Sequence, residues 1–376
     1  MQVLYLTHDL NDAASWRRVA MLRMAGARVT IAGFHRGPVR AGDGATVIVP
    51  LGETANGAFA QRMKAVAGAM IHTRRKLCDI APPDIILARN IETLALTPQV
   101  RRLFPSARTT VYECLDIHRL QLGAGLASRA LRLAERALLK KADLVLTSSP
   151  AFVREYFQGI QKIDTPIRVV ENKCLPGPSG ARTASAVPTI GWFGILRCRQ
   201  SLACLDAFTR ASPGAFKVKL RGRPALDVVP EFHTMVEANP DLEFLGTYAP
   251  EDLPDIYGNV DFCWAIDRYE AGANSDWLLP NRLYEGCRYG AVPVALEGTE
   301  VARFLAAHDI GITLPKADAL SLEHALSRAD CAELRDAVDS LPHELWTTNA
   351  AECASLLHAM VTPGNASSDL SLKVTA

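Results

Sequence analysis

An opening βαβ unit is predicted by residues 3–34, which have the sequence VLYLTHDLNDAASWRRVAMLRMAGARVTIAGF. Residues 3–6 form a short apolar run, residues 16–24 have helical spacing, and residues 28–34 form a second apolar run. This pattern predicts two parallel strands joined by a crossover helix.

The same alternation continues along the chain. Further strands are expected at 84–88, 109–115, 143–147, 189–193, 216–220, 242–245, 260–265 and 292–296, and further helices at 92–103, 126–141, 201–210, 251–257 and 281–289. Residues 171–188 are rich in Pro, Gly and Ser and predict a linker. We therefore expect an α/β protein with two doubly wound Rossmann-like domains facing each other across a cleft.

The expected boundaries follow from this pattern. They are an N-terminal domain over 1–172, a linker over 173–188, a C-terminal domain over 189–345, a helix over 346–362 that packs back on the N-terminal domain, and a disordered tail over 363–376.

The composition indicates a folded protein. The 376 residues are 49% hydrophobic and 22% charged, which excludes a disordered or fibrous chain. No apolar run reaches the ~18 residues of a membrane-spanning helix, and no basic head precedes the first apolar run. The nine cysteines are scattered and contain no Cys-x-x-Cys pair, as expected for reduced thiols. We therefore expect a cytoplasmic protein.

The charge is unevenly distributed. Residues 1–150 hold 21 Lys and Arg against 11 Asp and Glu, whereas residues 151–376 hold 20 against 29. Two helices expected in the basic half, over 60–77 and 126–141, combine basic and apolar side chains. Such helices dock on anionic membranes, although ordinary amphipathic core helices have the same pattern.

Several site classes are disfavoured. The turn from Thr7 to Asp12 has none of the glycines of a dinucleotide site, and there is no P-loop. No Asp-x-Asp pair stands at a strand end to hold a nucleotide-bound metal, which favours a metal-independent mechanism.

A candidate anion site lies at residues 190–199, where an apolar strand reaches Gly194 and is followed by Arg197 and Arg199. Ser201 is expected to cap the next helix, whose free N–H groups and positive dipole end attract phosphate. The arginines can add charge-assisted hydrogen bonds. Most turns of this kind bind nothing, so a purely structural role stays open.

A second candidate segment covers residues 280–294. Asn281 is expected to cap a helix after Pro280, with Arg282 in the first turn and Glu285 about one turn on. A carboxylate near a helix start can accept two hydroxyl donors, as a ribose diol offers, or can simply complement the dipole.

Residues 280–294 resemble the donor-binding segment of family-four glycosyltransferases of the GT-B fold, in which Pro-x-Lys/Arg-x-x-Glu precedes Gly-x-Pro-Val. Residues 191–199, 244–253 and 169–172 resemble three further elements of that family in order and spacing. Among family members, the sequence is similar to bacterial exopolysaccharide, succinoglycan-type enzymes, most strongly over 189–300 and weakly over 1–110.

The resemblance implies that Glu285 holds the ribose hydroxyls of a nucleotide diphosphate sugar. It also implies that Arg197, Arg199 and Arg282 neutralise the diphosphate, which the backbone N–H groups after Gly194 cradle.

The sequence departs from the family pattern in several places. The early Gly-Gly turn is missing, and Arg197 and Arg199 replace the usual Arg and Lys of the phosphate pair. The family's second glutamate is replaced by Trp277, with Asp276 beside it, and its Gly-Asp-Gly loop is replaced by Arg221-Gly222-Arg223. Asp276, Arg223 and Asn281 complete the predicted donor-binding set.

Candidate catalytic residues accompany the strand expected over 109–115. Asp116 and His118 follow its C-terminal end, where a doubly wound sheet binds ligands, and Glu113 lies within it. For an inverting transfer, Asp116 is the first choice of base, with Glu113 and His118 behind it. For a retaining transfer, the resemblance implies that the departing diphosphate takes the proton and His118 orients the donor. Capping a helix is the alternative role of Asp116.

Together these features predict a metal-independent hexosyltransferase that uses a nucleotide sugar, with a UDP-sugar as the first expectation. The acceptor is expected to be a saccharide or lipid-linked oligosaccharide in cell-surface polysaccharide synthesis, reached from the inner face of the membrane. No cofactor and no nucleic acid partner are expected. The alternatives are a nucleotide-sugar epimerase of the same fold and a non-catalytic protein that binds nucleotide sugar or saccharide.

Overall fold

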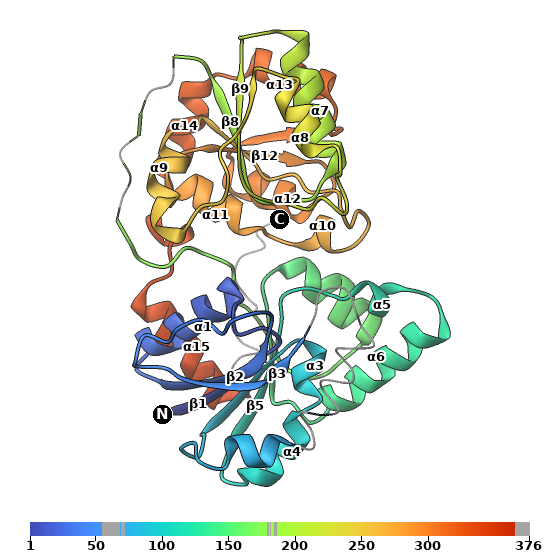
Figure 1. The fold of residues 1–376 in the computed structure, drawn as a ribbon, viewed down its shortest axis with the longest axis vertical. Helices are drawn as coiled ribbons and strands as arrows, with labels where there is room; N and C mark the ends of the chain where they lie inside the picture. Colours follow the sequence, from blue (N-terminus) through green and yellow to red (C-terminus); the bar gives the residue numbers. More distant parts are fainter. Residues whose placement is uncertain (55–67, 69–71, 179, 181, 184–185, 365–376) are drawn as a thin grey trace. The chain divides into compact units, whose positions relative to one another are not determined.

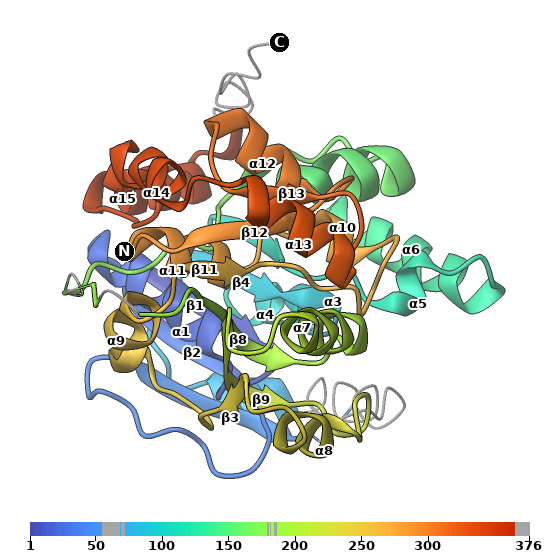
Figure 2. The same cartoon turned by 90° about the horizontal axis from the view of Figure 1, so that it is seen from above.

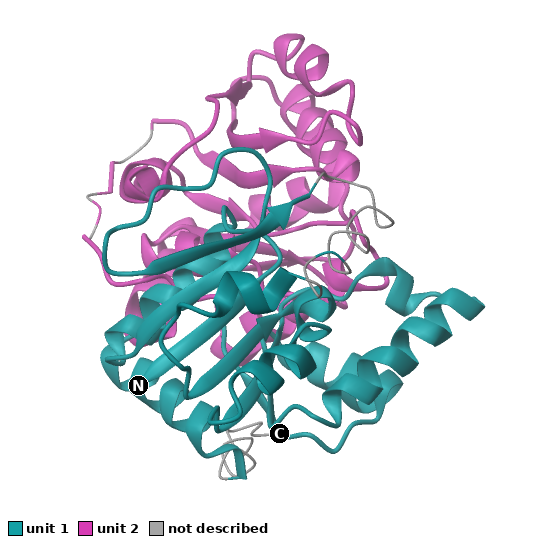
Figure 3. Ribbon diagram, turned by 60° about the horizontal axis from the view of Figure 1, so that its bottom comes forward, with its two compact units in different colours: residues 1–171, 349–376 teal, residues 172–348 magenta. Residues whose placement is uncertain are grey.

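The computed structural model describes residues 1–54, 68, 72–178, 180, 182–183 and 186–364. Figures 1 and 2 show the chain from two sides, and Figure 3 colours its two compact units. Unit 1 contains Met1–Glu171 and Asn349–Ala376, and unit 2 contains Asn172–Thr348. Each unit has one parallel sheet accompanied by helices, which confirms the predicted α/β class.

Unit 1 has a seven-stranded parallel sheet in the order β3-β2-β1-β4-β5-β6-β7. Its strands are β1 (Gln2–Thr7), β2 (Arg28–His35), β3 (Val47–Glu53), β4 (Ile85–Arg89), β5 (Thr109–Cys114), β6 (Leu144–Thr147) and β7 (Ile167–Val169). All residues of β4, β5 and β6 are buried, because helices cover both faces of a parallel sheet.

Strand β3 did not emerge from the sequence pattern. Pro50 and Gly52 interrupt its alternation, and the register with β2 shifts at Gly33. Proline is tolerated there because β3 is an edge strand, whose outer N–H groups need no partner strand.

The helices of unit 1 include one from the far end of the chain. They are α1 (Ala13–Met24), α3 (Asn90–Leu94), α4 (Thr97–Leu103), α5 (Arg119–Leu122), α6 (Leu126–Leu139), the π-helix η1 (Phe152–Gln161) and α15 (Ala350–Val361). Helix α15 lies beside α1 (Figure 1). The Thr109 hydroxyl on β5 donates to the Met360 carbonyl of α15 at 2.7 Å. The C-terminal helix is therefore part of unit 1.

Some expected elements differ in extent. The single helix expected over 92–103 is two helices, α3 and α4, because Pro98 stands at the start of α4 and lacks an N–H to continue an earlier helix. Most of the helix expected over 60–77 and nearly all of the tail expected over 363–376 lie outside the described residues.

Unit 2 has a six-stranded parallel sheet in the order β10-β9-β8-β11-β12-β13. Its strands are β8 (Thr189–Leu196), β9 (Lys217–Pro224), β10 (Leu242–Phe244), β11 (Phe262–Trp264), β12 (Val292–Leu296) and β13 (Ile312–Leu314). Trp192 and Trp264 are fully buried in its core.

The helices of unit 2 connect these strands. They are α7 (Arg199–Ala211), α8 (Phe232–Glu237), α9 (Leu253–Gly258), α10 (Asn274–Trp277), α11 (Asn281–Arg288), α12 (Glu300–His308), α13 (Ala319–Arg328), α14 (Cys331–Ser340) and the 3-10 helices η2 (Pro250–Asp252) and η3 (His343–Leu345). Figure 2 shows α12 beside β12 and β13.

The segment expected to be a linker is bonded to unit 2. The Cys174 amide donates to the Trp346 carbonyl at 2.9 Å, and the Thr183 amide donates to the Gly258 carbonyl at 3.0 Å. The contacts accordingly divide the chain after Glu171 and again after Thr348, rather than around a separate linker over 173–188.

Candidate functional site

The strand order of unit 2 reverses between β8 and β11, and ligands of doubly wound sheets bind at the carboxyl ends of strands beside such a reversal. Gly194 near the end of β8 has φ +110°, and Gly222 opposite it on β9 has φ +125°. A Cβ on Gly222 would lie 1.8 Å from the Gly194 carbonyl oxygen. Only glycine permits these two strands to approach so closely here.

Helix α7 begins before the position that the sequence suggested. Its N-cap is Cys198, whose sulfur accepts the Ser201 amide at 3.3 Å, so the expectation that Ser201 caps this helix is wrong. A thiol sulfur is a weak acceptor and is easily overlooked as a cap. Arg199 therefore occupies the first turn of the helix rather than the preceding loop.

Arg197 follows β8 and is held by the loop after β11. Its Nε lies 3.1 Å from Oδ2 of Asp267, and its guanidinium stacks over the Tyr269 ring at 4.8 Å. The Asp267 carboxylate also accepts the Tyr269 amide at 2.8 Å. This arrangement orients a half-buried cation at the switch point of the sheet.

Arg199 and Arg223, two other arginines of the predicted donor-binding set, are more exposed than Arg197. Arg199 pairs with Glu231 at 2.7 Å and donates to the Val228 carbonyl at 3.1 Å. Its side chain is 60% exposed, whereas that of Arg197 is 28% exposed. Arg223 is exposed near the end of β9.

Helix α11 starts with the predicted residues but without the predicted cap. Its N-cap is Pro280 with no side-chain hydrogen bond, so the expectation that Asn281 caps it is wrong, and Asn281 is the first helical residue. The Arg282 carbonyl accepts a hydrogen bond from the Cys263 thiol on β11 at 2.9 Å. Burial raises the pKa of Cys263 to about 12, so the thiol stays protonated and keeps this bond.

Arg282 and Glu285 provide the strongest polar features of α11. Within the described part of the chain, the Arg282 Nη1 is buried and has no hydrogen-bond partner. Glu285 is 7% exposed and accepts the Tyr257 hydroxyl at 3.1 Å. Burial, and then the Glu285 charge, raise the pKa of Tyr257, which keeps that hydroxyl a donor.

Asp276 lies on the short helix α10, where it closes the loop that follows β11. Its carboxylate accepts the Gly272 amide at 2.7 Å and the Arg268 guanidinium at 3.4 Å. The same loop carries Asp267, the partner of Arg197. The structure thus places Gly194, Arg197, Arg223 and the α11 start along one edge of the unit 2 sheet, with Asp276 on an adjoining loop.

Glu113, one of the three candidate bases, is too deeply buried to serve as one. It is fully buried in β5, where its carboxylate pairs with Arg18 at 2.6 Å and Arg89 at 3.7 Å and accepts the Tyr5 hydroxyl. Burial alone would raise the pKa of Glu113, but the two arginines and the Tyr5 hydrogen bond lower it. A base must reach its substrate, so this position is structural.

The other two candidates lie beyond the end of β5. Asp116 is exposed, and its carbonyl accepts the Cys114 thiol. His118 is the N-cap of α5, with its Nδ1 accepting the Leu120 amide at 3.2 Å, so the capping role considered for Asp116 falls to His118. A neutral imidazole that accepts at Nδ1 carries its proton on Nε2 and is a hydrogen-bond donor there.

The residues that hold these groups do not stand out in the sequence. Asp267 and Tyr269 orient Arg197, and Tyr257 orients Glu285. No local pattern identifies them, because each partner lies 28 or more positions away in the chain. The polar run from Asp267 to Glu270 after a buried strand was the available signal.

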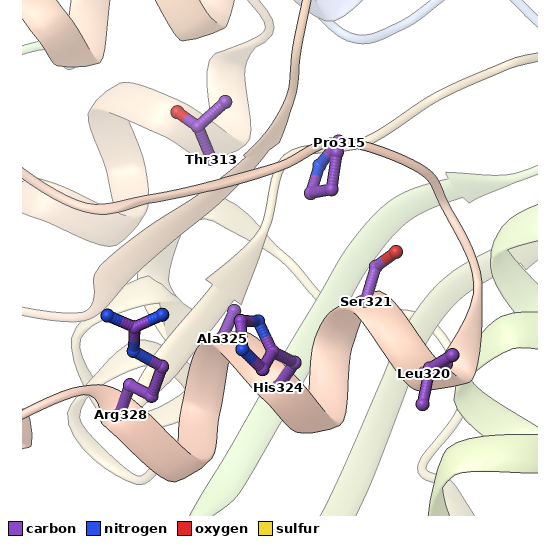
Figure 4. A pocket seen from close by; sticks show the side chains of 7 residues that line it. All are labelled: Thr313, Pro315, Leu320, Ser321, His324, Ala325 and Arg328. Carbon is purple, nitrogen blue, oxygen red and sulfur yellow. The ribbon is translucent and has the colours of Figure 1, made fainter.

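A separate hollow of about 570 Å³ lies in unit 2 between β13 and α13 (Figure 4). None of the predicted site residues lines it. Its lining residues are Thr313, Pro315, Leu320, Ser321, His324, Ala325 and Arg328. Among the described residues, no three His, Cys, Asp or Glu side chains are grouped so that they could hold a metal ion.

Comparisons with known proteins show what the chain resembles in sequence and in fold. Residues 14–173 match the family model of the glycosyl transferase 4-like domain. The succinoglycan biosynthesis protein ExoL of Rhizobium meliloti (strain 1021) is 46% identical, over 96% of this chain and 94% of that protein.

Two solved structures share the fold. The sucrose-phosphate synthase of Thermosynechococcus elongatus has a TM-score of 0.71 at 14% identity and covers 97% of both chains. Anabaena HepE in complex with UDP and glucose has a TM-score of 0.68 at 14% identity, over 96% of this chain and all of its own. The fold is thus that of GT-B glycosyltransferases. The match to the glycosyl transferase 4-like model, together with the 46% identity to ExoL over nearly the whole chain, shows that the protein belongs to this family of glycosyltransferases.

Proposed function

We propose that the protein transfers a hexose from a UDP-sugar to a hydroxyl of a saccharide, or lipid-linked saccharide, that is being built into an exopolysaccharide. The observation that carries the donor assignment is the buried Nη1 of Arg282, which lacks a partner in the described residues one turn before the buried carboxylate of Glu285. A buried guanidinium nitrogen without a hydrogen-bond partner is costly, and a diphosphate oxygen would satisfy it.

Different residues of the proposed donor site bind different parts of the nucleotide sugar. Glu285 accepts the two ribose hydroxyls, while Arg282 and Arg197 bind the diphosphate together with the N–H groups at the start of α7. Arg199 is a weaker candidate than Arg197, because its side chain is 60% exposed where that of Arg197 is 28% exposed. Positive groups placed before the reaction stabilise the charge on the departing UDP without a metal ion.

In the proposed transfer step, the Asp116 carboxylate acts as the base. The acceptor oxygen bonds to the anomeric carbon while the bond from that carbon to the diphosphate oxygen breaks, and the electron pair leaves with UDP. The hydroxyl proton passes to the Asp116 carboxylate, which gives inversion. His118, a donor at Nε2, orients a substrate oxygen. Retention of configuration would instead assign the proton to the departing diphosphate.

Calorimetric titration with UDP tests the donor site. Arg282→Met should weaken UDP binding by about tenfold or more, since charge-assisted hydrogen bonds to phosphate contribute about 1.5–3 kcal/mol. Arg303→Met is the matched control, because Arg303 is an exposed arginine of the same unit that pairs with Glu300 on its own helix. Equal UDP affinity in both variants would contradict the assignment.

Two further features support a transferase rather than the alternatives. The 46% identity to ExoL spans nearly the whole chain, and ExoL is named for polysaccharide biosynthesis. An epimerase would convert the donor alone, and a binding protein would convert nothing. Incubation with radiolabelled UDP-glucose or UDP-galactose and a cell lipid extract distinguishes these outcomes.

We also propose that α6 docks on an anionic membrane surface. Leu126 and Leu133 are 83% and 61% exposed, beside exposed Arg129, Lys140 and Lys141. Between residues 117 and 142 the one acidic residue, Glu135, is buried, where Tyr112, Tyr156 and Gln161 donate to it. The outer face is therefore apolar and basic, as in helices that lie in a membrane interface.

Vesicle sedimentation tests the docking. Among the described residues, no helix is long and apolar enough to cross a membrane. The protein should sediment with vesicles that contain phosphatidylglycerol at low salt, and Leu126→Ser with Leu133→Ser should abolish this. Leu320→Ser, at a leucine of unit 2 that is 76% exposed, is the control. Unchanged sedimentation of the double variant would contradict the proposal.

A further inference from the structure

Two polar residues follow adjacent strands at the switch point of the unit 1 sheet. His8 directly follows β1, and Asn90 directly follows β4. The β1–β4 register pairs Leu6 with Ala88, and two more residues bring His8 opposite Asn90. The strand order reverses between β1 and β4, where doubly wound sheets bind ligands.

Both side chains hold a buried polar atom with no hydrogen-bond partner in the described part of the protein. These atoms are Nδ1 of His8 and Oδ1 of Asn90. Leaving such an atom unpaired costs about 1–3 kcal/mol, and native proteins rarely accept that cost without a reason. Two unpaired atoms at the ends of adjacent strands indicate a ligand that satisfies both.

The backbone at Asn90 adds an independent observation. Asn90 has φ +66°, in the left-handed region that non-glycine residues rarely occupy, and it turns the chain abruptly from β4 into α3. Backbone strain of this kind costs about 1–3 kcal/mol and is concentrated at ligand sites. The strained turn holds the side chain of Asn90 at the strand end.

The charges around His8 determine the class of ligand. The surrounding ion pairs are Arg89 with Asp12 at 3.2 Å, Arg18 with Glu113 at 2.6 Å and Arg36 with Asp9 at 3.7 Å. Glu92 adds a further negative charge near His8. Three arginines thus face four carboxylates, so the cluster offers no surplus positive charge for a phosphate. A neutral, hydroxyl-bearing ligand fits this balance.

We propose that Nδ1 of His8 and Oδ1 of Asn90 bind hydroxyl groups of the neutral acceptor sugar in unit 1. The assignment rests on the proposed transferase function and names the residues that recognise the acceptor. Burial, and then the Arg89 charge, lower the pKa of His8, so the imidazole is neutral near pH 7 and suits a hydroxyl partner.

Saturation-transfer NMR with saccharide probes tests this inference. Methyl β-lactoside and methyl β-cellobioside are titrated into the full-length protein with UDP present. We expect the wild type to bind at least one of them, and His8→Leu to weaken that binding roughly tenfold. His8→Asn should retain most of it, because the asparagine amide lies near the position of Nδ1, whereas His8→Gln places its amide near Nε2 and should not.

Asn90→Gly keeps the test valid if His8 variants fail to fold. Glycine accepts φ +66° without strain, so this variant removes Oδ1 while the turn is preserved. It should weaken saccharide binding to a similar degree. Lys162→Gly is the matched control, since Lys162 has φ +52° elsewhere in unit 1, and it should bind like the wild type.

Several results would overturn the inference. They are equal saccharide binding by wild type, His8→Leu and Asn90→Gly, the absence of binding to the wild type, and displacement of the saccharide by 10 mM inorganic phosphate. UDP titration of the same samples tests the proposed donor site separately from the acceptor residues. Intact UDP binding with unaffected saccharide binding contradicts only the acceptor residues, and absent UDP binding contradicts the proposed donor site.

Discussion

Nε of Arg18 donates to Oε1 of Glu113 at 2.6 Å, and both side chains are almost completely buried in unit 1. Arg89 on the neighbouring strand β4 and Tyr5 on β1, the next strand along the sheet, approach the same carboxylate. This ion pair holds α1 against the sheet and supports the residues that surround His8.

Glu113→Gln should therefore destabilise the protein. Removing one partner of a buried ion pair leaves the other charge without compensation, at a cost of about 3–5 kcal/mol. Urea unfolding followed by circular dichroism measures the change. Glu231→Gln, in the exposed pair with Arg199, is the control and should cost less than about 1 kcal/mol. Similar losses in both variants would contradict the structural role of Glu113.

Asp116→Asn should abolish sugar transfer and leave UDP affinity unchanged. Asparagine retains the shape of the side chain but cannot take the acceptor proton. Transfer is measured with radiolabelled donor, and UDP binding by calorimetry. Full activity in this variant would remove Asp116 from the mechanism and favour proton transfer to the departing diphosphate.

Gly222→Ala should disturb the donor edge of unit 2. Its Cβ would meet the Gly194 carbonyl oxygen at 1.8 Å, so the strands must separate where the diphosphate is proposed to bind. Gly214→Ala is the control, because Gly214 also has a positive φ but a Cβ there meets nothing within 4 Å. We expect the control to lose about 1–2 kcal/mol and Gly222→Ala to lose more, together with UDP affinity. Equal effects would argue against close strand packing.

The lowered pKa of His8 should make the free energy of unfolding depend on pH. Burial, followed by the Arg89 charge, lowers its pKa below 6.5 in the folded protein. Above pH 6.5 the group is neutral in both states and contributes nothing. As the pH falls below 6.5, the unfolded chain binds a proton first, so the free energy of unfolding decreases, by at most about 1.4 kcal/mol per pH unit. His8→Asn should lack this component, and parallel curves for the two proteins between pH 7 and 5 would refute it.

Sugar transfer should continue in the presence of 5 mM EDTA. The proposed mechanism neutralises UDP with Arg197, Arg282 and the N–H groups at the start of α7, and it assigns no charge to a metal ion. A tenfold or larger loss of initial rate that Mg²⁺ or Mn²⁺ restores would show that these groups are insufficient.

Local patterns were enough to predict the alternation of strands and helices and the two parallel sheets. The donor roles of the segments around Arg197 and Glu285 stay predictions. Periodicity and turn residues act over a few positions, so the chain displays them directly. They did not reveal the caps at Cys198 and Pro280, since a thiol and a proline carry no familiar capping signal.

Long-range pairing decided the rest. Glu113 has the same local setting as a catalytic carboxylate at a strand end. Its structural role comes from the ion pair with Arg18, a residue 95 positions away in the chain. The left-handed turn at Asn90 and its position opposite His8 likewise depend on the pairing of β1 with β4. Burial and charge compensation are properties of groups that folding brings together, and no short stretch of sequence contains both members of such a pair.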